Sequence, residues 1–185
     1  MEFIQTAIPE VLHIQPKVFG DERGFFMETY SEQRYKEMGI GYRFVQDNHS
    51  RSAHGVLRGL HYQLKRPQGK LVRVVSGEVF DVAVDIRKGS PTFGHAVWEI
   101  LSAGMKNQFW VPPGFAHGFC VLSESADFEY KCTDFYDPSD EGSVLWSDPD
   151  LQIPWPVDKP LLSAKDSDAL ALVQIPAGKL PVYEG

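Results

Sequence analysis

The sequence predicts an all-β domain built as a sandwich, a jelly roll or a small barrel. About ten short segments that alternate apolar with polar residues follow one another at close spacing. Thirteen prolines and sixteen glycines are spread along the chain and separate these segments, as turns separate the strands of all-β folds. No linker or internal repeat interrupts the 185 residues, so we expect one domain spanning residues 1–185.

The first third of the chain is predicted to hold strands, one turn and one short helix. Ser31 is placed to cap a helix over residues 32–38, which Gly39 would end. The stretch 20–24 has glycine at both ends and is predicted to be a turn. Strand-like patterns cover residues 11–14, 16–19, 25–30 and 44–50, the last of which turns polar toward its end and could face a cleft.

The middle of the chain carries the remaining strands. A tight turn is expected at residues 76–78 between two of them. After residue 137 the sequence becomes irregular, with Trp146 and Trp155 expected to anchor it against the core, and a last short helix is expected over 166–172. The predicted strands lie at residues 56–63, 70–75, 79–86, 95–101, 109–122 and 128–136.

Composition excludes several classes of partner. The net charge of −7 and the pI near 5.3 argue against nucleic acid and anionic membranes. Residues 1–9 lack the basic and apolar regions of a signal peptide, and no apolar run reaches membrane-spanning length, so we expect a cytoplasmic protein. Cys120 and Cys132 lie in apolar surroundings without metal-type spacing and are expected to be reduced, packed thiols.

The most unusual stretch places three potential cations on strand-like sequence. Arg58 and His61 lie in residues 56–63, and Lys70 opens the next predicted strand. Burial of unpaired charge costs several kcal/mol or more, so such groups need partners. An anionic ligand is the natural candidate.

Two segments resemble the two motifs of the cupin superfamily, which implies a cupin-type jelly-roll sandwich or barrel with a few short peripheral helices. Residues 112–117 match its proline-x-glycine-x-x-histidine pattern, whereas the first motif reads His61-Tyr62-Gln63 and lacks the second histidine and the glutamate of metal-binding members. Only His61 and His117 remain as ligands, fewer than a stable metal site needs, so we expect no metal. A metal-dependent cupin oxygenase or isomerase is the alternative, and metal analysis would decide.

Over nearly its whole length the chain resembles the dTDP-4-dehydrorhamnose 3,5-epimerase family. An orienting carboxylate and nearby cations would suit an imidazole to abstracting a proton from carbon. The blocks that carry the resemblance are residues 6–9, 19–26, 46–50, 56–61, 68–73, 77–87, 113–119 and 162–166.

The resemblance implies a cofactor-independent inversion at C3 and C5 of dTDP-4-dehydro-6-deoxy-D-glucose. His61 would be the general base held by Asp166, Tyr130 the general acid, and Lys70 the group that stabilises the enolate. No cofactor is implied, because the C4 carbonyl of the substrate accepts the electron pair. Tyr130 by itself would be read as an ordinary core tyrosine.

The resemblance also implies a binding site for the nucleotide sugar that is shared in a homodimer. The N-terminal strands, about residues 1–30, would be exchanged between the two subunits. Tyr136 would stack on thymine, and the guanidinium groups of Arg23 and Arg58 suit the diphosphate. The implied substrate-binding residues are Arg23, Phe26, Glu28, Gln46, Asp47, Asn48, Arg58, Lys70, His117, Tyr136, Glu141 and Lys165.

Two further alternatives stay open. A relative that inverts only C3 or only C5 would carry nearly the same residues, and a non-catalytic sugar-binding jelly roll would not need His61 at all. We interpret the four remaining histidines as structural or solvated: His13, His49, His54 and His95.

Overall fold

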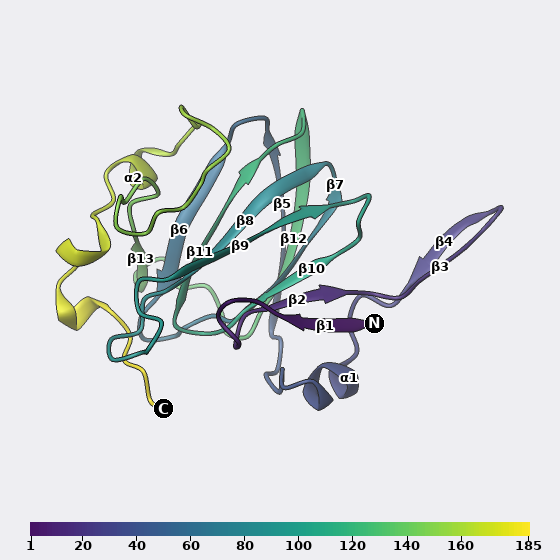
Figure 1. The fold of residues 1–185 in the computed structure, drawn as a ribbon, viewed down its shortest axis with the longest axis horizontal. Helices are drawn as coiled ribbons and strands as arrows, with labels where there is room; N and C mark the ends of the chain where they lie inside the picture. Colours follow the sequence, from purple (N-terminus) through teal and green to yellow (C-terminus); the bar gives the residue numbers. More distant parts are fainter.

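The computed structural model describes residues 1–185 and consists mainly of two antiparallel sheets that face each other (Figure 1). The prediction of an all-β jelly roll is confirmed. The larger sheet has the strand order β1 (Glu2–Gln5), β2 (Leu12–Gln15), β10 (Gln108–Val111), β7 (Lys70–Ser76), β12 (Ser125–Cys132) and β5 (Gln46–Ala53). The smaller sheet has the order β13 (Glu141–Ser143), β6 (Leu57–Gln63), β11 (Phe115–Val121), β8 (Glu78–Asp85) and β9 (Ala96–Ser102).

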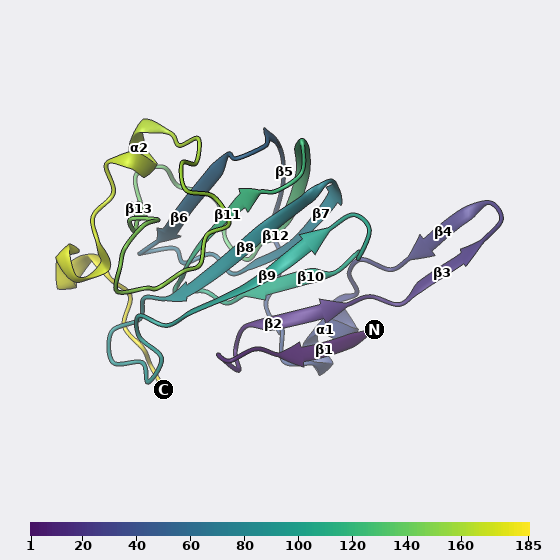
Figure 2. The same cartoon turned by 45° about the horizontal axis from the view of Figure 1, so that its top comes forward.

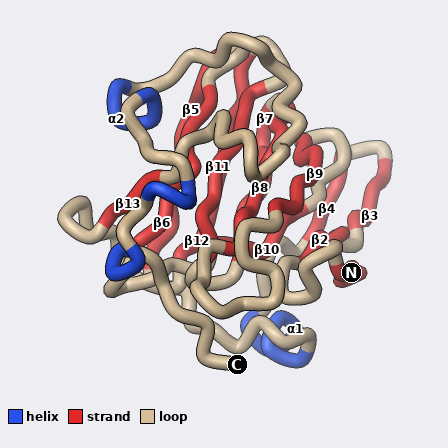
Figure 3. The backbone as a smooth tube through the Cα atoms, turned by 60° about the vertical axis from the view of Figure 1, so that its left-hand side comes forward, coloured by secondary structure: helices blue, strands red, loops and turns tan.

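Peripheral elements extend from this sandwich. The hairpin of β3 (Val18–Asp21) and β4 (Gly24–Met27) projects away from both sheets (Figures 1 and 2). The helix α1 (Glu32–Glu37) follows it. The C-terminal segment runs beside β6 and β13 and holds α2 (Ala164–Ser167), η1 (Leu172–Gln174) and η2 (Ala177–Lys179) (Figure 3). None of the helices combines the length and apolar character that crossing a membrane requires.

The main core lies between the two sheets and follows the period-2 alternation of the strands. Val72 and Val74 of β7 and Phe128 of β12 meet Val79 of β8 and Phe119 of β11 there. Each fully buried side chain of this kind contributes roughly 1.5–3 kcal/mol to folding. The sequence alternation of these strands therefore sets which residues enter the core.

Two smaller clusters cover the outer faces. The outward residues of β8, which include Phe80, Val82 and Val84, are buried beneath the C-terminal segment. On the larger sheet, Tyr35 and Ile40 of the α1 region cover Trp110 and Leu71. Because β8 is buried on both faces, its sequence is apolar with only small and acidic interruptions.

The element boundaries differ from the predictions in places. The segment 109–122 forms two strands in different sheets, because Pro112 and Pro113, which lack the N–H groups for a ladder, separate β10 from β11. The strand predicted at 128–136 is shifted to Ser125–Cys132, and the last helix ends at Ser167 rather than at residue 172. The predicted turn at 20–24 is mostly strand, since only two residues separate β3 from β4.

Two short strands, β1 and β13, were not predicted from the sequence. Strand β1 is almost wholly exposed, and β13 comprises only Glu141–Ser143. Both lie at the edge of a sheet, where no buried face imposes an apolar alternation.

A β-bulge in β6 brings Arg58 and His61 to the same face of the sheet. The register pairs His117 with His61 but Phe119 with Arg58, so β6 contains one extra residue between these pairs. Without the bulge, a separation of three residues would place the two side chains on opposite faces. Gly59, with a φ of 122°, and Gly118 permit the close approach of the two backbones.

Substitution of Gly118 by alanine should therefore destabilise the fold and disturb the bulge. A Cβ at Gly118 would lie 2.7 Å from the carbonyl oxygen of Arg58 and 3.1 Å from Cα of Gly59, so backbone has to move. We expect a loss of roughly 1–3 kcal/mol in the free energy of unfolding, measured by denaturant titration. Gly104→Ala, in an exposed turn with no atom closer than 3.8 Å, is the control, and equal stabilities of the two variants would contradict the prediction.

Candidate active site

The sequence-predicted catalytic residues meet in a cavity of about 490 Å³ between the sheets. His61 enters from the smaller sheet, whereas Lys70 and Tyr130 enter from β7 and β12 of the larger sheet. Asp166 comes from α2 in the C-terminal segment. The residues that line the cavity are Ser50, Val56, Leu57, Arg58, His61, Lys70, His117, Phe119, Phe128, Tyr130, Leu161, Leu162, Ser163, Lys165 and Asp166.

His61 and Asp166 form a short contact at the centre of the site. Nε2 of His61 lies 2.5 Å from Oδ1 of Asp166, although 105 residues separate them in the chain. Asp166 is 3% exposed, whereas the side chain of His61 is 24% exposed and faces the cavity. The carboxylate is therefore a buried support behind an accessible imidazole.

Local sequence and two backbone anchors place Asp166. The Ser163 hydroxyl caps α2 by accepting from the N–H of Asp166 at 3.2 Å. Before the helix, Leu161 bridges Val56 at the start of β6, and after it Leu170 bridges Val144. Because both ends of the segment are tied to the smaller sheet, the helix has little freedom to move away from His61.

The carboxylate fixes which nitrogen of His61 is basic. Burial alone would raise the pKa of Asp166, but the hydrogen bond and charge of His61, with help from Ser163 and Lys165, hold that pKa below its usual value. An ionised carboxylate only accepts hydrogen bonds, so Nε2 carries a proton and donates it. In the neutral ring, Nδ1 then holds the lone pair, 3.8 Å from Oε1 of Glu141.

The lowered pKa of Asp166 predicts an acid-dependent stability term. Its usual value is 3.8, and between that value and the lower folded-state pKa the unfolded chain binds more protons, so stability falls as the pH falls through this window. Asp166→Asn should lower the free energy of unfolding by roughly 1–3 kcal/mol at pH 7, because a hydrogen bond to charge is lost. The difference from the wild type should shrink below about pH 4.

Thermal unfolding over a series of pH values measures this effect. Asp158→Asn removes an exposed aspartate and serves as the control that should not alter the pH dependence. A difference between wild type and Asp166→Asn that stays constant down to pH 2.5 would refute the assignment.

Lys70 lies beside this pair in the same cavity. Burial lowers its pKa, while Cys132, Glu141 and Asp81 oppose that shift. No hydrogen bond to a carboxylate holds the ammonium group, unlike Lys165, whose Nζ lies 2.5 Å from Glu141. A desolvated ammonium facing a cavity is suited to stabilising negative charge that develops on a substrate.

Tyr130 stands on the wall opposite His61. It belongs to β12 of the larger sheet, between Asn48 of β5 and Val72 of β7, and it lines the same cavity as His61. Burial raises the pKa of its hydroxyl, which keeps the phenol protonated at neutral pH. A substrate between the sheets therefore has a base on one side and a proton donor on the other.

Strand β5 supplies a polar inner face. Gln46, Asn48 and Ser50 line the space between the sheets, and Ser52 accepts from Nε of Arg58 at 3.0 Å. Asp47 alternates to the outer face, where it pairs with Lys131 at 2.9 Å. The Asp47 side chain therefore points away from the cavity, because successive residues of a strand face opposite ways, and a binding role for Asp47 stays a prediction.

A second, smaller pocket shares His61, Lys70 and Tyr130 with the cavity, is lined by amides and by Tyr136, and is called here the far end of the cavity. The Tyr136 hydroxyl donates to Glu141 at 3.0 Å, and its backbone N–H donates to Oε1 of Gln46 at 3.0 Å. Gln63 and Gln68 line the same end. The structure thus brings Tyr136, Glu141 and Lys165 close to His61, as the site prediction requires.

Three predicted binding residues lie elsewhere in the chain. Arg23 and Phe26 belong to the projecting hairpin, where Arg23 pairs with Asp21 and Phe26 is 70% exposed. Glu28 pairs with Arg34 of α1 at 3.0 Å. Within one chain none of the three reaches the cavity, because the hairpin points away from the sandwich (Figure 2).

Arg58 is not buried. His61 and Lys70 are partly buried, whereas Arg58 is exposed at one end of the cavity. Its guanidinium therefore keeps solvent contact, and the bulge in β6 rather than burial determines its direction.

Two residues that support the site were not predicted from the sequence. Ser52 holds Arg58, and Asp81 holds His117, whose Nε2 lies 2.9 Å from Oδ1 of the fully buried aspartate. The signal for Asp81 was present as an acidic residue at an inward position of the apolar strand β8. The signal for Ser52 was only its even spacing with Gln46 and Asn48.

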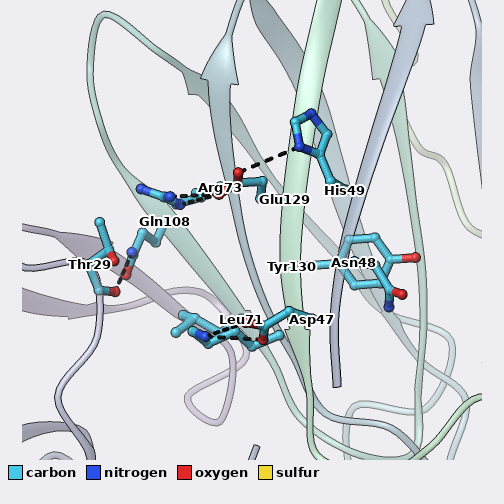
Figure 4. Close-up of a pocket in the computed structure, with 10 residues that line it drawn as sticks. Thr29, Asp47, Asn48, His49, Leu71, Arg73, Gln108, Glu129 and Tyr130 are labelled. Atoms are coloured by element: carbon cyan, nitrogen blue, oxygen red, sulfur yellow. Dashed lines mark hydrogen bonds and ion pairs between the residues drawn. The ribbon is translucent and has the colours of Figure 1, made fainter. Parts of the chain in front are cut away.

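A second hollow lies on the outer face of the larger sheet (Figure 4). Its charged groups neutralise one another: Arg73 bonds Glu129 at 2.6 Å, and His49 lies 3.7 Å from the same carboxylate. Gln108 donates to the carbonyl of Thr29. His49 thus belongs to a paired surface network, in agreement with its structural interpretation.

No group of three or more His, Cys, Asp or Glu side chains is arranged to hold a metal ion. The absence of a metal remains a prediction. Cys120 and Cys132 are both buried free thiols.

The jelly-roll fold and the site between its two sheets define a class of protein, the cupin-type isomerases. The model of the family described as dTDP-4-dehydrorhamnose 3,5-epimerase matches residues 5–174. The chain belongs to the dTDP-4-dehydrorhamnose 3,5-epimerase family.

Individual relatives agree with this assignment. A dTDP-4-dehydrorhamnose 3,5-epimerase of Pseudomonas aeruginosa is 59% identical over 173 residues, which cover 92% of this chain and 96% of the relative. The crystal structure of a dTDP-6-deoxy-D-glucose-3,5-epimerase from Legionella pneumophila, in complex with dTDP-4-keto-L-rhamnose, has a TM-score of 0.97 at 58% identity and covers 100% of this chain and 99% of that one. A dTDP-4-dehydrorhamnose 3-epimerase of Streptomyces niveus is 42% identical over 188 residues, 99% of this chain and 90% of the relative.

Proposed function

We propose that the protein converts dTDP-4-dehydro-6-deoxy-D-glucose to dTDP-4-dehydro-L-rhamnose by inverting C3 and C5, a step of dTDP-L-rhamnose synthesis. The observation that carries the proposal is the 2.5 Å pair of His61 and Asp166 on one wall of a cavity whose other wall holds Lys70 and Tyr130. Membership in the family names the substrate.

The chemistry follows from the acidity of hydrogens beside a ketone. Nδ1 of His61 removes the proton from C3 or C5, the electron pair of the C–H bond moves into the C4 carbonyl, and Lys70 stabilises the resulting enolate. Tyr130 returns a proton to the same carbon from the opposite face, which inverts the centre. Exchange with water reprotonates the phenolate and deprotonates the imidazolium before the second carbon reacts.

A coupled assay tests this function. The protein is supplied with dTDP-4-dehydro-6-deoxy-D-glucose, NADPH and a reductase specific for dTDP-4-dehydro-L-rhamnose, and dTDP-L-rhamnose is the expected product. In heavy water, both C3 and C5 should exchange their hydrogen. Exchange at only one carbon would favour a single-site epimerase, the activity named for the Streptomyces niveus relative.

We also propose that the working protein is a homodimer in which residues of about 1–30 complete the site of the other subunit. The hairpin exposes three phenylalanines: Phe19 at 54%, Phe25 at 61% and Phe26 at 70%. An exposed cluster of apolar side chains of this kind marks a surface that another protein covers. A second subunit of the same chain would cover these rings and bring Arg23, Phe26 and Glu28 to a cavity.

Complementation between two variants tests the shared site. Arg23→Ala and His61→Asn should each have low activity. When the two chains are co-expressed, the mixed dimer contains one intact site only if Arg23 and His61 of one site come from different subunits. We expect turnover of the isolated mixed dimer to recover to about half the wild-type value per dimer, because one of its two sites would be intact. No recovery in an isolated mixed dimer would show that each subunit uses its own Arg23, and a monomer by light scattering would refute the dimer.

A cytoplasmic location fits the two free thiols. Both cysteines are buried and unpaired, which is the normal state in reducing compartments. We therefore propose that the enzyme works in the cytoplasm, and fractionation of cells with a tagged chain would test this.

A further inference from the structure

The space between the sheets holds two adjoining pockets of different chemistry, which form the two ends of the site. His61, Lys70 and Tyr130 are common to both ends and lie between them. One end holds Arg58 with an apolar wall that includes Phe119. The other end is lined by polar side chains and one exposed ring: Gln46, Asn48, Gln63, Gln68, Glu141 and Tyr136.

Strand β6 measures the separation of the two ends. Arg58 lies three residues before His61, and Gln63 lies two residues after it. Because the bulge sets Arg58 and His61 opposite Phe119 and His117, only two residues apart on β11, a rise of about 3.3 Å per residue places Arg58 and Gln63 each roughly 7 Å from His61, on opposite sides. Gln63 accepts from the N–H of Asp137 at 2.8 Å, so the loop that carries Tyr136 belongs to the Gln63 end.

The substrate has a linear order that must match this arrangement. A nucleotide sugar runs from base to deoxyribose, diphosphate and C1, and C4 lies across the ring from C1. If Lys70 stabilises the C4 oxygen and Tyr136 stacks on the base, the diphosphate lies between them, on the Tyr136 side of the reacting carbons. The Arg58 end then receives only the groups beyond C4.

The chemistry of the Arg58 end suits those groups. Nε of Arg58 donates to Ser52 at 3.0 Å, which leaves the N–H groups of both Nη atoms free to donate into the cavity. The neighbouring apolar wall, with Phe119 and Phe128 stacked at 4.2 Å, suits the C6 methyl group, the one apolar substituent of the sugar. A cation and an apolar wall together correspond to the C4 oxygen and C6.

We infer that Arg58 is a second cation for the C4 oxygen, acting with Lys70 on the enolate, and that it does not bind the diphosphate. This rests on the proposed function and replaces the diphosphate role that the sequence suggested for Arg58. Ser52 becomes a positioning residue that directs the guanidinium, and the nucleotide lies toward Tyr136 and Glu141.

Binding of dTDP separates the two roles, since dTDP contains the diphosphate but no sugar beyond it. By calorimetry, Arg58→Gln should bind dTDP within about twofold of the wild type, whereas Tyr136→Ala should bind it roughly 2–10-fold more weakly. In the coupled assay, Arg58→Gln should lower kcat by roughly 10²-fold, as loss of one donor to a developing oxyanion does. A tenfold loss of dTDP affinity in Arg58→Gln, with Tyr136→Ala unaffected, would overturn the inference.

Two further measurements keep the test decisive. Arg58→Lys retains the charge and should recover at least about tenfold of the kcat lost in Arg58→Gln; no recovery would argue against a charge effect at the enolate. Heavy-water exchange by the wild type reports on the proposed function alone. If the wild type exchanges neither C3 nor C5, that function fails, while calorimetry still shows which end holds the nucleotide.

Discussion

His61→Asn should lower kcat by at least roughly 10²–10⁴-fold, because it removes the only imidazole in contact with Asp166. Asparagine is smaller and keeps a donor for the aspartate, so the fold should survive, with a thermal midpoint close to that of the wild type. The heavy-water experiment should lose exchange at C3 and C5 together, since one base serves both carbons. The rate of label incorporation, followed by NMR, is the direct measurement.

His49→Asn is the matched control. His49 also pairs with a carboxylate, at 3.0 Å from Asp127, but it lies on the outer face of the larger sheet. Its substitution should leave kcat within about twofold, because surface pairs of this kind contribute little. If His61→Asn retained full activity, the protein would be a sugar-binding jelly roll without catalytic use of the histidine, and the epimerase proposal would fail.

Lys70→Met should separate activity from stability. The change preserves the length of the side chain but removes the cation that stabilises the enolate, so kcat should fall by roughly 10²–10³-fold. The same substitution should raise the thermal midpoint, because burial penalises the charged ammonium and lowers its pKa. A lower kcat together with a higher thermal midpoint is the expected result when a functional group is destabilised by its own burial.

The pH dependence supplies a second measurement of Lys70. Between its lowered folded-state pKa and the usual value of 10.5, the unfolded chain binds more protons than the folded chain. Stability contributed by this residue therefore rises with pH through that window, and Lys70→Met should lack the rise. Lys131→Met, on the outer face beside Asp47, serves as the control and should leave kcat unchanged. A destabilised Lys70→Met with normal kcat would contradict both parts.

The two substitutions distinguish the roles of the walls of the cavity. Loss of the base removes proton abstraction, whereas loss of Lys70 leaves the base in place and raises the energy of the enolate. Both should therefore lower exchange in heavy water, but only Lys70→Met should alter the alkaline dependence of stability. Agreement of the kinetic and thermodynamic measurements would connect the enolate role to the burial of the ammonium group.

The catalytic residues were predicted from the family resemblance, and the local alternation of the strands explains why several of them face the cavity. The inward positions of β7 and β12 place Lys70 and Tyr130 toward the cavity by period 2 alone. The same rule, applied to β5, places the Asp47 side chain on the outer face, since it alternates with Gln46 and Asn48.

Other features depend on contacts that no local pattern encodes. The sequence by itself determined an all-β jelly roll, the set of chemical groups and the family resemblance. Only the tertiary structure decided that Asp166 reaches His61 from 105 residues away, and that a bulge opposite Gly118 turns Arg58 to the same face. It also placed Tyr136 and Arg58 at opposite ends of the cavity and directed the hairpin with Arg23 away from it. The physical reason is that strand register, bulges and segment anchors are set by long-range packing, whereas side-chain alternation is set by neighbouring residues.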